Sequence, residues 1–251
     1  MPTLRIVGGG RAGSAMALAL QAHGWSLRGL LGRADDPSEA AVGVDLCIIA
    51  TPDAAVSEVA SHIAPQPDTV VAHLSGALGL ETLAPHVRRA SIHPLVALPD
   101  GQRGALALSS AAWFAVAGDP LARVVVADLG GRAIEVDDQR RAQYHAAACI
   151  ASNHTVALLA QVERVAAAAG VPLAAYLDLV RATIDNVGAL GPSAALTGPV
   201  ARGDWATVEK HLNSIDPSEV PLYEALVRAT AELAGRAVPD DIGALEVVAC
   251  S

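Results

Sequence analysis

The chain has 251 residues, of which 52% are hydrophobic and 3% aromatic, and its formal net charge is −9. This length allows one large or two modest domains with a real core. The basic residues form no cluster, which argues against a nucleic-acid partner. The cysteines Cys47, Cys149 and Cys250 are far apart, which indicates a reducing cytoplasm and neither a disulfide framework nor a zinc site.

A strand, a tight turn and a helix open the chain, so we expect no signal peptide. Residues 4–13 read LRIVGGGRAG, and SAMALALQAHG follows. Gly8 permits the sharp turn, Gly10 leaves room for a pyrophosphate, and Gly13 lets the helix pack close to the strand. This spacing predicts a dinucleotide-binding turn, and the alternative is a purely structural turn.

The helix start that follows this turn suits an anion. Its free N–H groups and the helix dipole attract phosphates. We therefore count Arg11 and Ala12 with the three glycines as cofactor-binding residues, and Arg11 adds positive charge.

Six further strands alternate with short helices after this opening. This pattern predicts a doubly wound parallel sheet, a Rossmann domain that spans residues 1–137. The expected strands cover residues 27–31, 44–50, 69–74, 90–93, 112–117 and 132–136.

The pattern becomes helical from residue 138 to residue 251, which we expect to be a separate all-helical domain. The predicted helices cover residues 138–169, 173–190, 204–212 and 217–235. Residues 142–162 carry no formal charge, but their polar side chains argue for a helix between protein surfaces and against a membrane span. This Ala-rich helix leaves more apolar surface than the domain can hide alone, which predicts a homodimer through the C-terminal helices.

The residue after the second predicted strand bears on the choice of dinucleotide. An acidic residue at this place binds the ribose of NAD, whereas Arg33 can pair with the 2′-phosphate of NADP. Asp35 and Asp36 follow closely and could oppose this choice. We expect NADP, with NAD as the less favoured alternative.

Polar residues and prolines follow three of the predicted strands. Ligands in open parallel sheets lie beyond the carboxyl ends of the strands. Thr51 and Ser75 can hydrogen-bond a nicotinamide ribose or amide, Pro52 can press on the ring, and His93 is better placed for a substrate. The alternative is that such residues only cap helices and turns, Thr51 above all.

The first predicted helix of the second domain carries a polar face. His145, Cys149, Ser152 and Asn153 share it at i, i+4, i+7 and i+8. His145 could donate the proton that balances hydride addition, because imidazole titrates near neutral pH, and Asn153 could orient a carbonyl or carboxylate across the domain cleft. The alternative is a polar seam between helices.

The loop at residues 191–204, GPSAALTGPVARGD, is a shaped connector. Arg202 could clamp a substrate carboxylate, or it could make a capping contact. Asp204 is the expected N-cap of the next helix.

Four segments carry a family resemblance that extends over essentially the whole chain: SIHPL (91–95), YHAAACIASN (144–153), LVRATIDNV (179–187) and LTGPVARGD (196–204). They resemble bacterial Rossmann-like proteins of the 6-phosphogluconate dehydrogenase-like superfamily whose C-terminal domain has no known function. Relatives in that superfamily are ketopantoate reductase, pyrroline-5-carboxylate reductase and the deazaflavin-dependent NADP oxidoreductases. The resemblance implies a dimeric NADP-dependent oxidoreductase.

One position departs from the superfamily. Several members use a Lys-x-x-x-Asn motif whose lysine acts in acid–base catalysis. If Asn153 takes the asparagine place, Cys149 stands at the lysine place, and Lys210 is the only lysine of the chain. Two functions therefore remain open: a reductase of a small carbonyl- or imine-containing acid with His145, Asn153 and His93 at its site, and a non-catalytic NADP-binding sensor.

Overall fold

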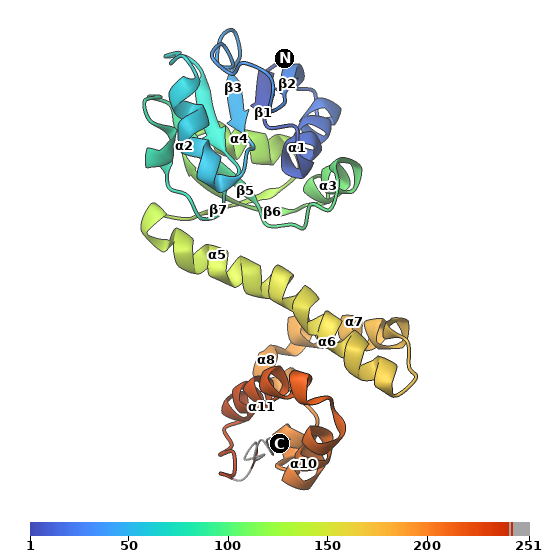
Figure 1. The fold of residues 1–251 in the computed structure, drawn as a ribbon. Coiled ribbons are helices and arrows are strands. Elements are labelled where there is room, and N and C mark those ends of the chain that lie inside the picture. The colour runs from blue at the N-terminus through green and yellow to red at the C-terminus, as the bar shows by residue number, and fades with distance from the viewer. Residues whose placement is uncertain (241, 243–251) are drawn as a thin grey trace, which may run out of the picture. The chain divides into compact units, whose positions relative to one another are not determined.

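The computed structural model describes residues 1–240 and 242 (Figure 1). The described residues form two compact units, of which the first is Met1–Asn153 and the second begins at His154. The first unit contains the sheet and also α5 (Arg141–Cys149). The domain boundary at residue 137 remains a prediction. Cys250 lies outside the described residues.

The first unit is built on one seven-stranded sheet, which confirms the predicted fold class. Its strand order is β2-β1-β3-β4-β5-β6-β7. The strands are β1 (Thr3–Val7), β2 (Ser26–Leu31), β3 (Leu46–Ile49), β4 (Val70–His73), β5 (Arg89–Pro94), β6 (Trp113–Gly118) and β7 (Arg132–Glu135).

The direction of the last two strands differs from the expectation of a wholly parallel sheet. The strands β1 to β5 are parallel, β6 pairs antiparallel with β5, and β7 is parallel to β6. Between β5 and β6 the chain forms α3 (Gly101–Leu108), a helix that we did not predict. Asp100 caps α3 by accepting a hydrogen bond from the backbone N–H of Arg103 at 2.8 Å. The sheet is therefore mostly parallel.

Helices cover both faces of this sheet. One hydrophobic core lies under α1 (Arg11–Ala22), α3 and α4 (Leu121–Asp128), and the other lies under α2 (Asp53–His62) and η1 (Leu80–Leu83). Successive strand residues point to opposite faces, so Ile48 belongs to the first core and Ile49 to the second. Burial on both faces explains why β3 and β4 are nearly all apolar.

The described residues of the second unit are helical, as predicted. Its core contains Val200, Val208, Leu212, Val227, Ala231 and Ile242. None of the residues of α7 is buried. The elements are α6 (Thr155–Ala168), α7 (Leu173–Leu190), α8 (Pro192–Ala195), α9 (Pro199–Arg202), α10 (Trp205–Ser214), η4 (Pro217–Glu219) and α11 (Val220–Leu233).

The predicted helix at residues 138–169 is helical throughout but is not one regular α-helix. It consists of a 3₁₀ turn, η2 (Asp138–Arg140), then α5, a π-helical turn, η3 (Ile150–His154), and α6. A π turn holds more residues per turn than an α-helix, so the α-helical face drawn through Ser152 and Asn153 changes direction there. Among the described residues, no helix has the length and hydropathy required to cross a membrane.

Candidate functional site

The predicted glycine turn joins β1 to α1, and two of its glycines are required by close backbone contacts. Gly8 has a φ of +113°, and a Cβ there would lie 2.6 Å from the carbonyl carbon of Ala50. A Cβ on Gly13 would collide with the carbonyl oxygen of Gly8. Gly10 differs, because a Cβ on it would meet nothing within 4 Å. The turn therefore packs tightly against β3 and leaves one glycine facing open space.

A cavity of about 860 Å³ lies over this turn, and we call it the glycine-turn cavity. It brings together five of the predicted cofactor-binding residues, which are Gly8, Gly10, Arg33, Thr51 and Pro52. The other lining residues are Val7, Gly9, Gly32, Asp35, Pro37, Ala50, Ala55, Glu58, Val59 and His62.

Thr51 has a buried hydroxyl oxygen without a hydrogen-bond partner among the described residues. The helix α2 begins after Pro52 and has no side-chain cap, so Thr51 does not cap it. A buried hydroxyl without a partner is costly and is ordinarily satisfied by a ligand or by water. Its position in the cavity lining makes it a candidate ligand-binding group.

Arg33 and its acidic neighbours lie at one wall of the same cavity. Asp35 also lines the cavity, but its carboxylate accepts a hydrogen bond from the backbone N–H of Gly32 at 2.7 Å. Asp36 accepts hydrogen bonds from the backbone and hydroxyl of Ser38, which lower the pKa of its carboxyl group. Each acid is therefore engaged within its own loop, next to the exposed Arg33.

Four predicted cofactor residues are not part of the cavity lining within the described chain: Arg11, Ala12, Gly13 and Ser75. Arg11 is the exposed first residue of α1, and Ala12 packs against the core. The hydroxyl of Ser75 donates a hydrogen bond to Asp53 at 2.7 Å and accepts two from backbone N–H groups. The hydroxyl of Ser75 therefore stabilises its own loop.

A second cavity of about 600 Å³ contains all three predicted catalytic residues, and we call it the histidine cavity. His93 contributes from β5, His145 from α5 and Asn153 from η3. The other lining residues are Pro94, Leu95, Val96, Ala97, Tyr144, Ala147, Ala148, Cys149, Ala151 and Ser152. The predicted polar face, including Cys149 and Ser152, thus borders one cavity.

Three aromatic side chains meet in the histidine cavity. The Nδ1 atom of His93 lies 2.6 Å from the hydroxyl oxygen of Tyr144, and the rings of His93 and His145 have centroids 6.1 Å apart. Gly76, just after β4, makes room for both histidines. A Cβ there would lie 2.8 Å from His145 and 2.9 Å from His93.

Burial sets the protonation of two of these groups. It lowers the pKa of His93 to about 4, with smaller contributions from His145 and Arg141. Burial also raises the pKa of Tyr144 to about 12. Near neutral pH, therefore, His93 is an uncharged imidazole and Tyr144 keeps its proton. The Sγ atom of Cys149 lies 3.8 Å from Nε2 of His145.

Tyr144 is a site residue that we did not predict. It stands next to His145 in the sequence, but the polar face was drawn with α-helical spacing from His145 onward. The signal that could have identified it is the i, i+1 pair Tyr144-His145 in a segment otherwise rich in alanine.

Both cavities lie at the same edge of the sheet. The strands β3, β4 and β5 are parallel neighbours, so their carboxyl ends coincide. Thr51 follows β3, Gly76 follows β4, and His93 lies near the end of β5. Two strand spacings, about 10 Å in all, separate β3 from β5. A ligand as long as a dinucleotide can span that distance along the edge.

The predicted residues of the second unit have a simpler setting. Asp204 caps α10, as expected, because its carboxylate accepts hydrogen bonds from the backbone N–H and hydroxyl of Thr207. These bonds lower the pKa of Asp204. Arg202 is the exposed last residue of α9, and its role as a carboxylate clamp remains a prediction. No cluster of metal-ligating side chains exists among the residues that the structure describes.

Two family models match the chain, one in its N-terminal part and one in its C-terminal part, in the order that the sequence predicts. Residues 32–99 match the model described as a Rossmann-like domain, and residues 114–230 match the model described as a domain of unknown function, DUF2520. These matches confirm the resemblance to Rossmann-like proteins whose C-terminal domain has no known function. The chain matches none of the curated proteins with which it was compared.

Three solved structures illustrate the fold similarity. A candidate NADP oxidoreductase from Bacteroides fragilis has a TM-score of 0.78 at 21% identity, covering 92% of this chain and 98% of its own. A Thermotoga maritima protein has a TM-score of 0.71 at 25% identity, with coverage of 92% and 98%. A reductive aminase from Aspergillus terreus, solved with NADPH and ethyl levulinate, has a TM-score of 0.65 at 18% identity, with coverage of 94% and 98%. At these identities the similarity establishes the fold.

Proposed function

We propose that this chain, in which a Rossmann-like domain precedes a DUF2520 domain, is an NADP-dependent oxidoreductase that reduces a small carbonyl- or imine-containing acid. The observation that carries the proposal is the pair of cavities at one sheet edge. One has the shape and donors for a dinucleotide, and the other gathers groups that can hold and move a proton. The names of the similar structures, which include an NADP oxidoreductase and a reductive aminase, support the same class.

The residues of the glycine-turn cavity fit the cofactor. The open side of Gly10 leaves space for a pyrophosphate, and the first N–H groups of α1 have no acceptor within the helix. The unpartnered hydroxyl of Thr51 can bind a ribose or amide group, and Pro52 can lie against a ring. Arg11 adds positive charge at the helix start.

Arg33 is the residue that favours NADP over NAD in this proposal. Its guanidinium can pair with a 2′-phosphate in bidentate fashion. The carboxylates of Asp35 and Asp36 accept hydrogen bonds from Gly32 and Ser38. These bonds hold the two carboxylates within their own loop and limit their repulsion of a 2′-phosphate bound by Arg33.

Bound NADPH supplies a hydride to the carbon of the C=O or C=N bond, and one proton must reach the oxygen or nitrogen. We assign the proton to His145, which lines the histidine cavity. Tyr144 keeps its proton near neutral pH and donates it in a hydrogen bond to Nδ1 of the uncharged His93, so its hydroxyl oxygen is left to accept a hydrogen bond from the substrate. Asn153 can orient a carbonyl or carboxylate of the substrate. Removal of a general acid typically lowers turnover about 100-fold or more.

The second candidate is an NADP-binding sensor without turnover. It is favoured by Cys149, which takes the place of the superfamily's catalytic lysine if Asn153 takes the place of the asparagine. In this case the histidine cavity would bind a ligand but carry no reaction.

Calorimetry and a substrate panel test the proposal. We expect the purified protein to bind NADPH more tightly than NADH and to oxidise NADPH with at least one 2-oxo acid or cyclic imine. His145→Ala should lower turnover about 100-fold or more and keep NADPH binding, whereas His154→Ala, which changes an exposed histidine outside the cavity lining, should keep both. Turnover in His145→Ala at the rate of the unmodified protein would rule out His145 as the acid. Absence of binding to either nucleotide would refute both candidate functions.

We also propose that the chain forms a homodimer through its C-terminal helices and works in the cytoplasm. The helix α7 has exposed apolar side chains, among them Leu179, Ile184 and Leu190, and no buried residue. Light scattering at micromolar concentration tests the dimer, and a monomeric mass would contradict it.

A further inference from the structure

The first residue of α5 is a buried arginine. Arg141 is only 1% exposed, and its Nε atom donates a hydrogen bond to Asp138 at 2.9 Å. Its Nη1 and Nη2 atoms have no hydrogen-bond partner among the described residues. Buried unsatisfied donors cost free energy, and the positive end of the helix dipole disfavours a cation at this place. Both the unsatisfied Nη donors and the helix dipole therefore disfavour Arg141 at this position, which indicates that the residue has a specific role here.

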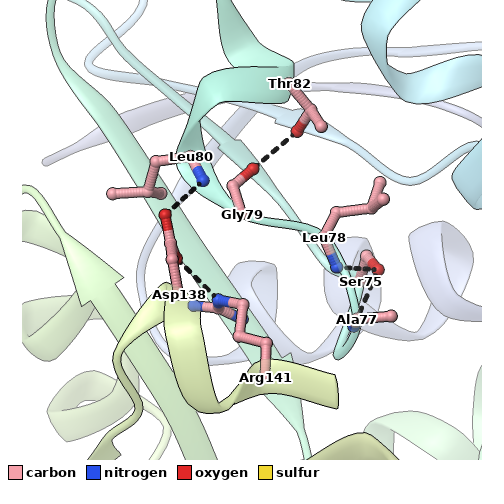
Figure 2. Close-up of polar contacts among 8 residues, drawn as sticks. All are labelled: Ser75, Ala77, Leu78, Gly79, Leu80, Thr82, Asp138 and Arg141. Atoms are coloured by element: carbon pink, nitrogen blue, oxygen red, sulfur yellow. Dashed lines mark hydrogen bonds and ion pairs between the residues drawn. The ribbon is translucent and has the colours of Figure 1, made fainter.

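Asp138 connects this arginine to the loop after β4, as Figure 2 shows. One carboxylate oxygen accepts the hydrogen bond from Arg141, and the other accepts one from the backbone N–H of Leu80 at 2.9 Å. A Cβ on Gly79 would lie 2.9 Å from the second oxygen, so glycine leaves the room that this contact needs. The carboxylate thus bridges α5 and the loop.

The other end of the same loop is also fixed. The hydroxyl of Ser75 accepts hydrogen bonds from the backbone N–H groups of Ala77 and Leu78, both at 3.1 Å (Figure 2), and donates one to Asp53 in α2. Gly76, which packs against both histidines of the histidine cavity, lies within this loop. The loop is therefore held by α2 on one side and by Asp138 on the other.

We propose that Asp138 and Arg141 are positioning residues that fix the first turn of α5 to the loop at residues 75–80. Tyr144 and His145 follow Arg141 by three and four residues, so they lie on the same side of the helix. With Arg141 anchored, these two side chains meet His93 above Gly76. The inference rests on the proposed function, because it concerns the proton-donating groups of that site.

The charge of Arg141 adds to this mechanical role. Burial is the largest cause of the lowered pKa of His93, and the charges of His145, Arg141 and His73 lower it further, while Asp53 raises it. His73 is fully buried, and burial is the largest cause of its lowered pKa; the charge of Arg141 lowers that pKa further, while Asp53 and Asp138 raise it. Keeping His93 uncharged keeps its Nδ1 atom available as the acceptor for the Tyr144 hydroxyl.

Histidine NMR of the full-length protein tests the proposal without any measurement of activity. In Arg141→Met we expect the pKa of His93 to rise from about 4 by part of the interval to 6.5, because burial remains. The hydrogen-bonded proton between His93 and Tyr144 should lose its signal. The matched control is Arg181→Met, which removes an exposed arginine of another i, i+3 pair, and it should change neither property. An unchanged pKa and an unchanged signal in folded Arg141→Met would overturn the proposal.

Two further variants keep the test decisive. Asp138→Asn/Arg141→Met removes both charges, so that neither member of the pair is left as an unpaired charge, and it should reproduce the loss of the proton signal. Arg141→Lys keeps the charge but loses the planar fork, so it should weaken the signal with little change in the pKa of His93. If only the lysine variant folds, an undiminished signal in it refutes the proposal. NADPH affinity should change less than about twofold in every variant. If the unmodified protein did not bind NADPH, the proposed function would be refuted, but the NMR result on Arg141 would still hold.

Discussion

The two cavities at the sheet edge are built by different means. Backbone and small residues dominate the walls of the glycine-turn cavity, and three of its glycines, Gly8, Gly9 and Gly10, are consecutive. The histidine cavity depends on titratable side chains from β5 and α5, about fifty positions apart in the chain. The first is therefore specified by local conformation, and the second by burial, charge and hydrogen bonds between distant segments.

This difference predicts that acid affects the histidine side of the molecule most. The folded-state pKa values of His73 and His93 are about 4, against an ordinary value of 6.5. The unfolded chain therefore binds more protons between these values, so the free energy of unfolding falls as the pH falls from 6.5 to 4. The loss is on the order of 3 kcal/mol per histidine. Urea unfolding at pH 7.5 and 4.5 measures it, and equal stabilities would contradict the assignment.

Gly13→Ala tests the close backbone contact in the glycine turn. The added Cβ collides with backbone, which cannot move aside as a side chain can, so we expect a loss of about 3 kcal/mol of stability. NADPH affinity should fall with it. Gly10→Ala is the matched control: its Cβ enters open space, so stability should stay native while affinity alone drops. Native stability in Gly13→Ala, measured by chemical denaturation, would refute the close contact.

Gly76→Ala is the corresponding change in the histidine cavity. Its Cβ would displace the rings of His93 and His145, and we expect turnover to fall about 100-fold. Calorimetry should find NADPH affinity within about twofold of the unmodified protein. If nucleotide affinity fell as much as turnover, the two cavities would not be separable in function.

Thr51→Val has the smallest expected effect. Removing an unpartnered buried hydroxyl should leave stability unchanged or slightly higher. The loss of one hydrogen bond to NADPH should weaken binding by about 1 kcal/mol, which is several-fold. An unchanged dissociation constant would mean that Thr51 does not contact the cofactor.

The sequence predicted what local rules determine. The seven strands and the helix α7 follow from apolar runs bounded by Gly and Pro, and the spacing Gly8-x-Gly10-x-x-Gly13 identified a turn in which Gly8 and Gly13 are sterically required. The reversed direction of β6 was not predictable, because an apolar run does not encode strand direction. The buried Arg141 was missed because a cation in a polar helix start ordinarily faces solvent. Its partner Asp138 meets the backbone N–H of Leu80, 58 positions away, only in the folded chain.

The π-helical turn η3, between α5 and α6, makes the orientation of Asn153 in the histidine cavity depend on the number of residues in this helical segment. Such a turn contains one residue more than the α-helix would need, so deletion of a single residue there could restore regular winding. The α-helical turns on either side would then keep nearly the same orientation around the axis, and the side chains within the turn would change direction. Asn153 would leave the orientation in which it borders the cavity, although its own codon had not changed. An inserted or deleted codon in this stretch is therefore a more drastic event than most substitutions within it.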